Sequence, residues 1–79
     1  MNIQVKLYGS LRRFSQPDTP GVWLGDIPLK STLQALMQQI DIPEQEIWIA
    51  AINGKACPFD TEIPEGATVI FVTARGSGG

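Results

Sequence analysis

Apolar and polar residues alternate over the first stretch of the chain. Ile3, Val5 and Leu7 fall on one face of residues 2–8, and Tyr8 falls on the other face with the polar residues. A period of two is typical of a strand with one buried face, so this stretch predicts a half-buried strand. Further apolar runs bounded by turn residues predict strands at 22–27, 47–52 and 68–73.

One segment shows a helical period instead. Apolar side chains recur at positions i, i+3, i+4 and i+7 between Leu33 and Ile40, which places them in a single stripe. Ser31 and Gln34 have the spacing of a capping box, so Ser31 is the expected N-cap, and Pro43 follows the end of the helix. Because so short a domain buries little apolar surface, we expect the stripe to pack on the chain's own sheet.

Turn signals connect these elements into two hairpin-like pairs. Asn53 and Gly54 both tolerate a positive φ angle and predict a hairpin that returns as a short strand over 55–57. The run 47–52 is expected to be covered on both faces or nearly so, and 68–73 is expected at the centre of the sheet. A crossover through the helix places the first and last strands parallel and adjacent. One helix covers only one face, so the other face stays partly open.

Composition narrows the class of function. The net charge of the 79 residues is −2 and the six lysines and arginines are scattered, which argues against a nucleic-acid partner. With Cys57 as the single cysteine and no histidine, neither an internal disulfide nor a Cys/His zinc site is expected, and no metal is expected. The apolar runs are too short to span a bilayer, and the alternating N-terminus does not resemble a signal peptide. We expect one cytoplasmic domain without a membrane partner.

The chain ends in a glycine-rich segment. Three of the last four residues are glycine, which loses more backbone entropy on ordering than other residues. We expect a folded domain over 1–74 and a mobile arm over 75–79, which would extend roughly 15 Å when fully stretched. A frayed end or an engineered linker has a similar composition, and this alternative stays open.

No set of catalytic side chains converges in the sequence, and we expect no catalytic residue. Asp41, Glu44 and Glu46 follow the helix and are expected to be solvated. Cys57 is expected to be a small buried strand residue, because nothing places a cation or a helix N-terminus beside it. The remaining reactive group is the carboxylate of Gly79, which must be activated, typically as an acyl adenylate, before a nucleophile attacks it.

The order of the predicted elements and three short segments resemble a known family. The segments are Asn53-Gly54 in the second hairpin, Ile63-Pro64-Glu65-Gly66 before the last strand, and the terminal Gly78-Gly79. Over the whole chain these features are similar to the ubiquitin-like β-grasp sulfur carriers, namely the molybdopterin synthase small subunit and the thiamine-pathway carrier. The resemblance implies an α+β, β-grasp fold with a mixed sheet of four to five strands and one main helix on one face. The segment Tyr8-Gly9-Ser10-Leu11-Arg12-Arg13 fits the molybdopterin branch better.

The resemblance also implies a function for the tail. An E1-like adenylyltransferase would use ATP to adenylate Gly79, and a sulfurtransferase would convert the adenylate to a thiocarboxylate. Gly76, Ser77 and Gly78 would then insert into the large subunit of a molybdopterin synthase, expected as a heterotetramer, and the thiocarboxylate would donate sulfur to the pterin. The carrier itself would bind no cofactor, and the catalytic side chains would belong to the large subunit.

Carriers of this family contact their activating enzyme through an apolar patch on the open sheet face and an arginine near the first strand. By position, the resemblance implies that Tyr8, Arg12 and Val72 form this surface, although a core position for Val72 is the alternative. The parity of the first strand independently permits Tyr8 to be exposed.

Two other kinds of function share these features. A sulfur carrier for another pathway, such as thiamine thiazole synthesis, or a ubiquitin-like protein modifier that forms isopeptide bonds would need the same tail. A β-grasp binding module that is not a carrier would have the same body and an incidental glycine-rich end. The sequence does not separate these possibilities.

Overall fold

A computed structural model describes residues 1–73 of the chain. The expected arm over 75–79 lies outside the described residues, as does Ala74 at the expected domain boundary. The ends of the strands and of the helix differ from the predicted ends by no more than one residue. The elements are β1 (Asn2–Leu7), η1 (Gly9–Phe14), β2 (Val22–Asp26), α1 (Leu33–Ile40), η2 (Glu44–Glu46), β3 (Ile47–Ile52), β4 (Lys55–Ala56) and β5 (Thr68–Thr73), where η denotes a 3₁₀-helix.

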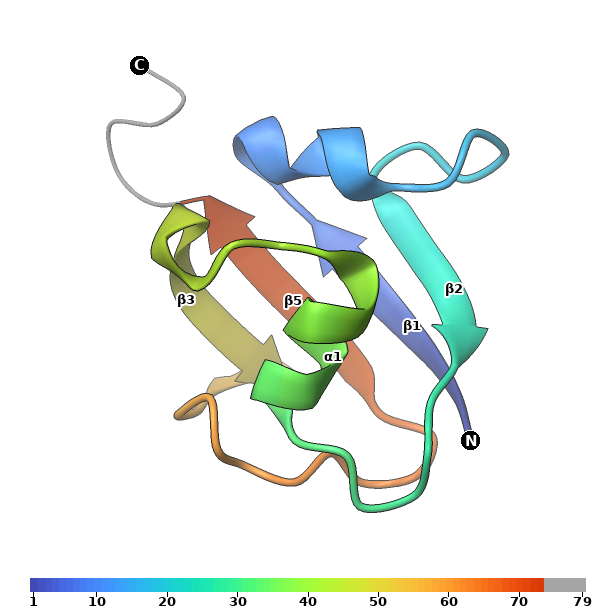
Figure 1. Ribbon diagram of the computed structural model, residues 1–79, viewed down its shortest axis with the longest axis vertical. Helices are drawn as coiled ribbons and strands as arrows, with labels where there is room; N and C mark the ends of the chain where they lie inside the picture. Colours follow the sequence, from blue (N-terminus) through green and yellow to red (C-terminus); the bar gives the residue numbers. More distant parts are fainter. Residues whose placement is uncertain (74–79) are drawn as a thin grey trace.

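The five strands form one mixed sheet in the order β2-β1-β5-β3-β4 (Figure 1). β1 and β5 lie parallel at its centre, with Val5 opposite Val69 and Leu7 opposite Phe71. The other neighbouring strands pair antiparallel. The expected architecture, with the first and last strands parallel and adjacent and one helix on one face, is confirmed.

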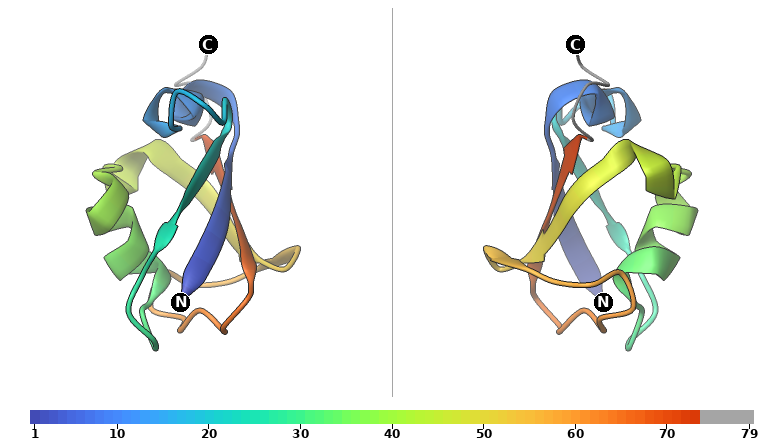
Figure 2. Two further views of the ribbon diagram at one scale, coloured as in Figure 1. Left: turned by 90° about the vertical axis from the view of Figure 1, so that its right-hand side faces the viewer. Right: turned by 90° about the vertical axis from the view of Figure 1, so that its left-hand side faces the viewer.

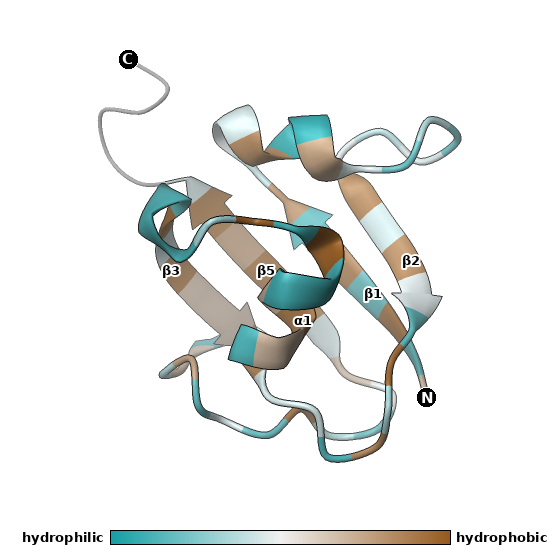
Figure 3. Ribbon diagram, viewed as in Figure 1, coloured by the Kyte–Doolittle hydropathy of each residue, from teal (hydrophilic) through white to brown (hydrophobic). Residues whose placement is uncertain are grey.

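α1 lies on one face of the sheet and encloses the core against it (Figure 2). The central strands contribute Val69 and Phe71, which are fully buried, and Figure 3 shows that β3 and β5 consist mostly of hydrophobic residues. No polar or charged residue is buried in the described part of the chain. The helix contributes the predicted stripe, which consists of Leu33, Leu36, Met37 and Ile40.

The N-cap of α1 is Thr32, so the prediction of Ser31 was wrong. The hydroxyl oxygen of Thr32 accepts a hydrogen bond from the N–H of Ala35 at 3.2 Å, and Thr32 has the extended backbone of an N-cap. The Ser31 hydroxyl instead donates to the carbonyl of Pro28 at 2.6 Å, within the turn that leads into the helix. Ser31 and Thr32 are adjacent, and either hydroxyl could cap the helix. Because the Ser31 hydroxyl binds within the turn, Thr32 serves as the N-cap.

A bulge in β3 overturns the expectation that this strand is covered on both faces or nearly so. Ile47 pairs with Thr73 and Ile49 pairs with Val72, so Trp48 is an extra residue without a counterpart on β5. The Trp48 side chain is 61% exposed. The apolar run predicted burial, but a bulge shifts the register and changes which residues point outward.

The ring of Trp23 lies against Gly25 on β2. Trp23 is half-buried and packs on the edge of the core. A Cβ atom added at Gly25 would lie 2.7 Å from Cζ2 of the Trp23 ring, which is closer than two carbon atoms approach without strain. Gly25 therefore provides the space that the ring occupies.

Replacing Gly25 with alanine should lower the free energy of unfolding by about 1–3 kcal/mol, because the ring must leave its site on the core. Urea denaturation of wild type, Gly25→Ala, Trp23→Leu and the double variant measures this. In the Trp23→Leu background the added methyl group meets a smaller side chain, so the cost of Gly25→Ala should shrink. An equal cost in both backgrounds would contradict the assignment of the strain to Trp23.

Candidate functional site

The predicted reactive end of the chain continues from β5. Gly76, Ser77, Gly78 and Gly79, for which the resemblance implies tail insertion and thiocarboxylate formation, lie outside the described residues. The described part of the candidate site is therefore the end of β5 at Thr73, the segment that holds it, and the surface around it.

The hydroxyl group of Thr73 joins the end of β5 to the segment after β1. It donates a hydrogen bond to the carbonyl of Tyr8 at 2.7 Å and accepts one from the N–H of Leu11 at 3.3 Å. The hydroxyl of Ser10 lies 3.5 Å away as a third partner. A threonine hydroxyl has one donor and two acceptor positions, so these contacts use its full capacity.

Gly9 packs directly against Thr73. Its φ angle is +63°, and a Cβ atom added there would lie 2.8 Å from the Cβ atom of Thr73. Only glycine adopts this backbone conformation readily and leaves this space free. Neither Gly9 nor Thr73 was predicted as a site residue. The predicted parallel pairing of the first and last strands could have identified both residues. If the register of Leu7 with Phe71 is extended by two residues, Gly9 lies opposite Thr73.

Tyr8 and Arg12, two of the predicted partner residues, lie together. Tyr8 is 49% exposed, as the strand parity predicts, and Arg12 is exposed on η1. Both line a hollow of about 340 Å³ whose rim also includes Lys6. Neither Lys6 nor Arg12 forms a salt bridge within residues 1–73, whereas Arg13 pairs with Glu46. The hollow therefore presents two positive charges beside an aromatic ring.

Val72 lies on the face of β5 opposite to α1. Its neighbours Phe71 and Val69 point to the helix and are fully buried, whereas Val72 is half-buried, so the alternative core position is wrong. The N–H of Tyr8 donates to the carbonyl of Phe71 at 3.1 Å, which brings Tyr8 alongside Val72. Tyr8 therefore lies between the other two predicted residues, with Arg12 in the same hollow and Val72 on the neighbouring strand.

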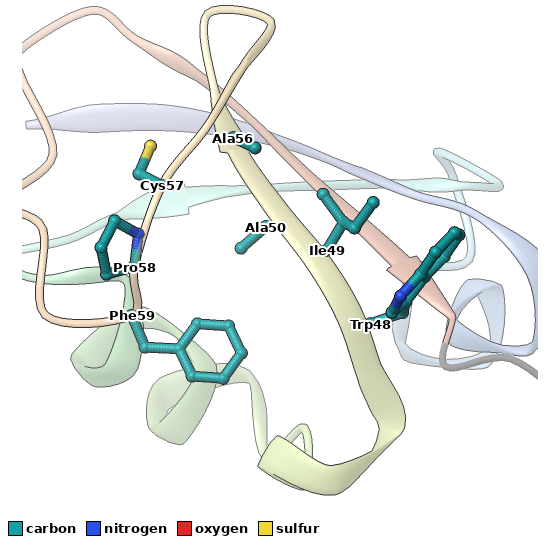
Figure 4. Close-up of a pocket in the computed structure, with 7 residues that line it drawn as sticks. All are labelled: Trp48, Ile49, Ala50, Ala56, Cys57, Pro58 and Phe59. Carbon is teal, nitrogen blue, oxygen red and sulfur yellow. The ribbon is translucent and has the colours of Figure 1, made fainter.

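Three further apolar residues, none of them predicted as a site residue, extend this surface. Ile49 pairs with Val72 across the sheet, and Ile70 has the same parity as Val72 on β5. Trp48 and Ile49 project from the same side of β3 (Figure 4). We call Tyr8, Trp48, Ile49, Ile70 and Val72 the open-face patch. Apolar residues that gather on one exposed face of a small domain are typical of an interaction surface.

A groove of about 390 Å³ follows the outer edge of β3, between Trp48 and Phe59 (Figure 4). Its lining is mainly apolar and contains no acid–base pair. Cys57 lies in this groove just beyond β4 and is half-buried, so the expectation of a buried strand residue was wrong. Its thiol donates to the carbonyl of Lys55 at 3.0 Å. The described residues contain no group of three His, Cys, Asp or Glu side chains that could hold a metal ion.

The fold defines the class of protein as a ubiquitin-like β-grasp domain. A family model described as the ThiS family matches residues 5–79, and the chain belongs to this family of sulfur carriers. Carriers of this type are generally not catalysts themselves. Within residues 1–73, no helix is long and apolar enough to cross a membrane.

Two solved structures share the fold. A Pyrococcus furiosus protein assigned as molybdopterin converting factor, subunit 1, is 17% identical with a TM-score of 0.69, over 91% of this chain and 95% of that chain. SAMP1 from Haloferax volcanii is 13% identical with a TM-score of 0.69, over 99% of this chain and 100% of that chain. No match was found among curated protein sequences.

Replacing Gly9 with alanine should destabilise the domain more than the same change at Gly54. Both residues have a positive φ angle, but a Cβ atom at Gly54 meets nothing within 4 Å, so Gly54→Ala introduces backbone strain alone. Gly9→Ala adds the clash with Thr73 and should lower the free energy of unfolding by about 1–3 kcal/mol more. Urea denaturation measures the free energy of unfolding of the two variants. Equal decreases would mean that Thr73 can move away from the added methyl group without destabilising the domain.

Proposed function

We propose that this chain is the sulfur carrier subunit of a molybdopterin synthase. The Gly79 carboxylate attacks the α-phosphorus of ATP on an E1-like adenylyltransferase and releases pyrophosphate. Sulfur at the oxidation level of sulfide, supplied by a sulfurtransferase, then attacks the acyl carbon, displaces AMP and leaves a thiocarboxylate. The large synthase subunit, with which the carrier would form a heterotetramer, receives the tail and uses this sulfur to build the dithiolene of molybdopterin.

The observation that carries the proposal is the extent of the family match. The matched region runs through Gly79, so it includes the proposed reactive end as well as the β-grasp body. The connection between β1 and β2, which contains η1, and the likeness to a protein assigned as molybdopterin converting factor favour the molybdopterin branch. A cytoplasmic location is part of the same proposal.

In this function, partner proteins bind the folded domain and thereby bring the tail to their active sites. The open-face patch offers apolar area to the activating enzyme, and Arg12 and Lys6 offer positive charge to its acidic residues. Both surfaces lie close to Thr73, the last described residue of β5. A partner that binds there is therefore positioned beside the start of the tail.

The second candidate function is sulfur donation to the thiazole of thiamine. It is favoured by the matching family model, which covers carriers of the thiamine type and the molybdopterin type together. The two functions share the activation of Gly79 and differ in the protein that accepts the thiocarboxylate.

The intact mass of the protein after incubation with ATP, an E1-like enzyme and a sulfur donor tests the carrier function. We expect a gain that corresponds to replacement of one oxygen by sulfur, located at Gly79. A variant that lacks Gly79 should fold normally and show no gain, because the reacting carboxylate has moved. Sulfur gain by the truncated protein would contradict the proposal.

Adding either a molybdopterin synthase large subunit or a thiazole synthase to the loaded carrier then separates the two pathways. Conjugates on lysines would point to a protein modifier.

Placing a charge in the open-face patch should weaken binding to the activating enzyme. In Val72→Glu an unpaired carboxylate would be buried in the interface, and we expect the KM for the carrier to rise about 10-fold or more. Gln38→Glu on the exposed face of α1 carries the same charge change on the opposite side of the domain and serves as the control. Equal KM values for the two variants would exclude the open-face patch as the docking surface.

A further inference from the structure

The side chain of Thr73 replaces backbone pairing at the point where that pairing ends. Between β1 and β5 the paired positions stop at Leu7 and Phe71, and the N–H of Tyr8 makes a last bond to the carbonyl of Phe71. Two residues further along β5, the Thr73 hydroxyl takes over and binds Tyr8 and Leu11. On the other side of Thr73, pairing with β3 continues past the bulge at Trp48 to a single pair between Thr73 and Ile47.

The end of β5 therefore depends on this one hydroxyl for its connection to η1. Within residues 1–73, every hydrogen bond between a β5 side chain and the segment from Tyr8 to Leu11 involves Thr73. Leu11 is fully buried, so η1 is itself fixed to the core and offers a rigid partner. Gly9 adds close packing against the Thr73 side chain.

We propose that Thr73 is a positioning residue that fixes the point and direction in which the tail leaves the domain, so that a partner bound to the domain receives the tail carboxylate in a defined geometry. The proposal rests on the proposed carrier function. Its physical basis is that a fixed starting point limits the directions from which the tail can enter a partner's site, where misplacement of a reacting group by about 1 Å can slow a reaction by roughly 100-fold. An anchor at the start of a tail acts on the rate of the chemical step more than on the affinity of the body.

Thr73→Val tests this, because valine keeps the shape of threonine and removes the hydroxyl. With the E1-like enzyme, we expect kcat for activation of the tail to fall about 10-fold while the KM for the carrier stays within about twofold. Thr73→Ser restores the hydroxyl and should recover most of the rate. Thr68→Val makes the same change at the other end of β5, where the Thr68 hydroxyl forms no hydrogen bond among the described residues, and it should leave kcat unchanged.

Hydrogen exchange of the Leu11 amide tests the anchor without any enzyme. This amide donates to both the Thr73 hydroxyl and the carbonyl of Tyr8, each at 3.3 Å. Thr73→Val removes one of these two acceptors, so exchange should accelerate by up to about 10-fold in Thr73→Val and stay near the wild-type rate in Thr73→Ser and Thr68→Val. A denaturation curve for each variant separates this local change from a loss of global stability.

The possible outcomes are distinct. A wild-type kcat in Thr73→Val, or a loss that appears in KM alone, would overturn the positioning role. Unchanged Leu11 exchange in Thr73→Val would show that the bond to the Tyr8 carbonyl protects the amide without the hydroxyl, and it would overturn the anchor. If the wild-type protein gains no thiocarboxylate from an active E1-like enzyme encoded by the same organism, the proposed function fails, and the exchange measurement still decides whether the hydroxyl holds the end of β5.

Discussion

The parallel pairing of β1 with β5 is the interaction on which the rest of the molecule depends. It joins residues about sixty positions apart in the sequence, Val5 with Val69 and Leu7 with Phe71, and it places all four on the buried side of the sheet. Parallel strands need a crossover connection, and α1 lies within that connection and covers the face that the crossover creates. The same pairing brings the start of η1 beside the end of β5, so the core and the candidate site are produced by one arrangement of two strands.

Most of the fold could be predicted because its signals are local and strong. The alternation around Ile3 and Val5, the stripe on α1 and the Asn53–Gly54 turn each fix one element, and the structure gives positive φ angles at Asn53 and Gly54 as that turn requires. The misses have specific causes. Ser31 is not the N-cap because its hydroxyl binds the carbonyl of Pro28 in the preceding turn. Trp48 is exposed because of a bulge, and a bulge depends on the register between two strands, which the sequence of one strand does not show.

The candidate site could be predicted only in part. The resemblance supplied Tyr8, Arg12 and Val72, strand parity permitted the exposure of Tyr8, and the structure brings the three residues to one side of the molecule. Thr73 and Gly9 were missed because their importance lies in a contact between two chain segments, and the sequence of either segment shows only a strand end or a break. The role of a polar side chain at the end of a central strand can be predicted only when the register of that strand is known, because the register determines which segment the side chain contacts.

The bulge at Trp48 also affects the edge of the sheet. β4 has two residues and pairs only with Ala51 and Ile52, so the outer edge of β3 is longer than the strand that covers it. A regular uncovered edge is a template on which a second chain can add a strand and begin to aggregate. The extra residue interrupts the even spacing of backbone donors and acceptors along this edge, which makes such addition less favourable. A domain that exposes apolar residues on one face of its sheet thereby gains protection against self-association along the edge nearest to them.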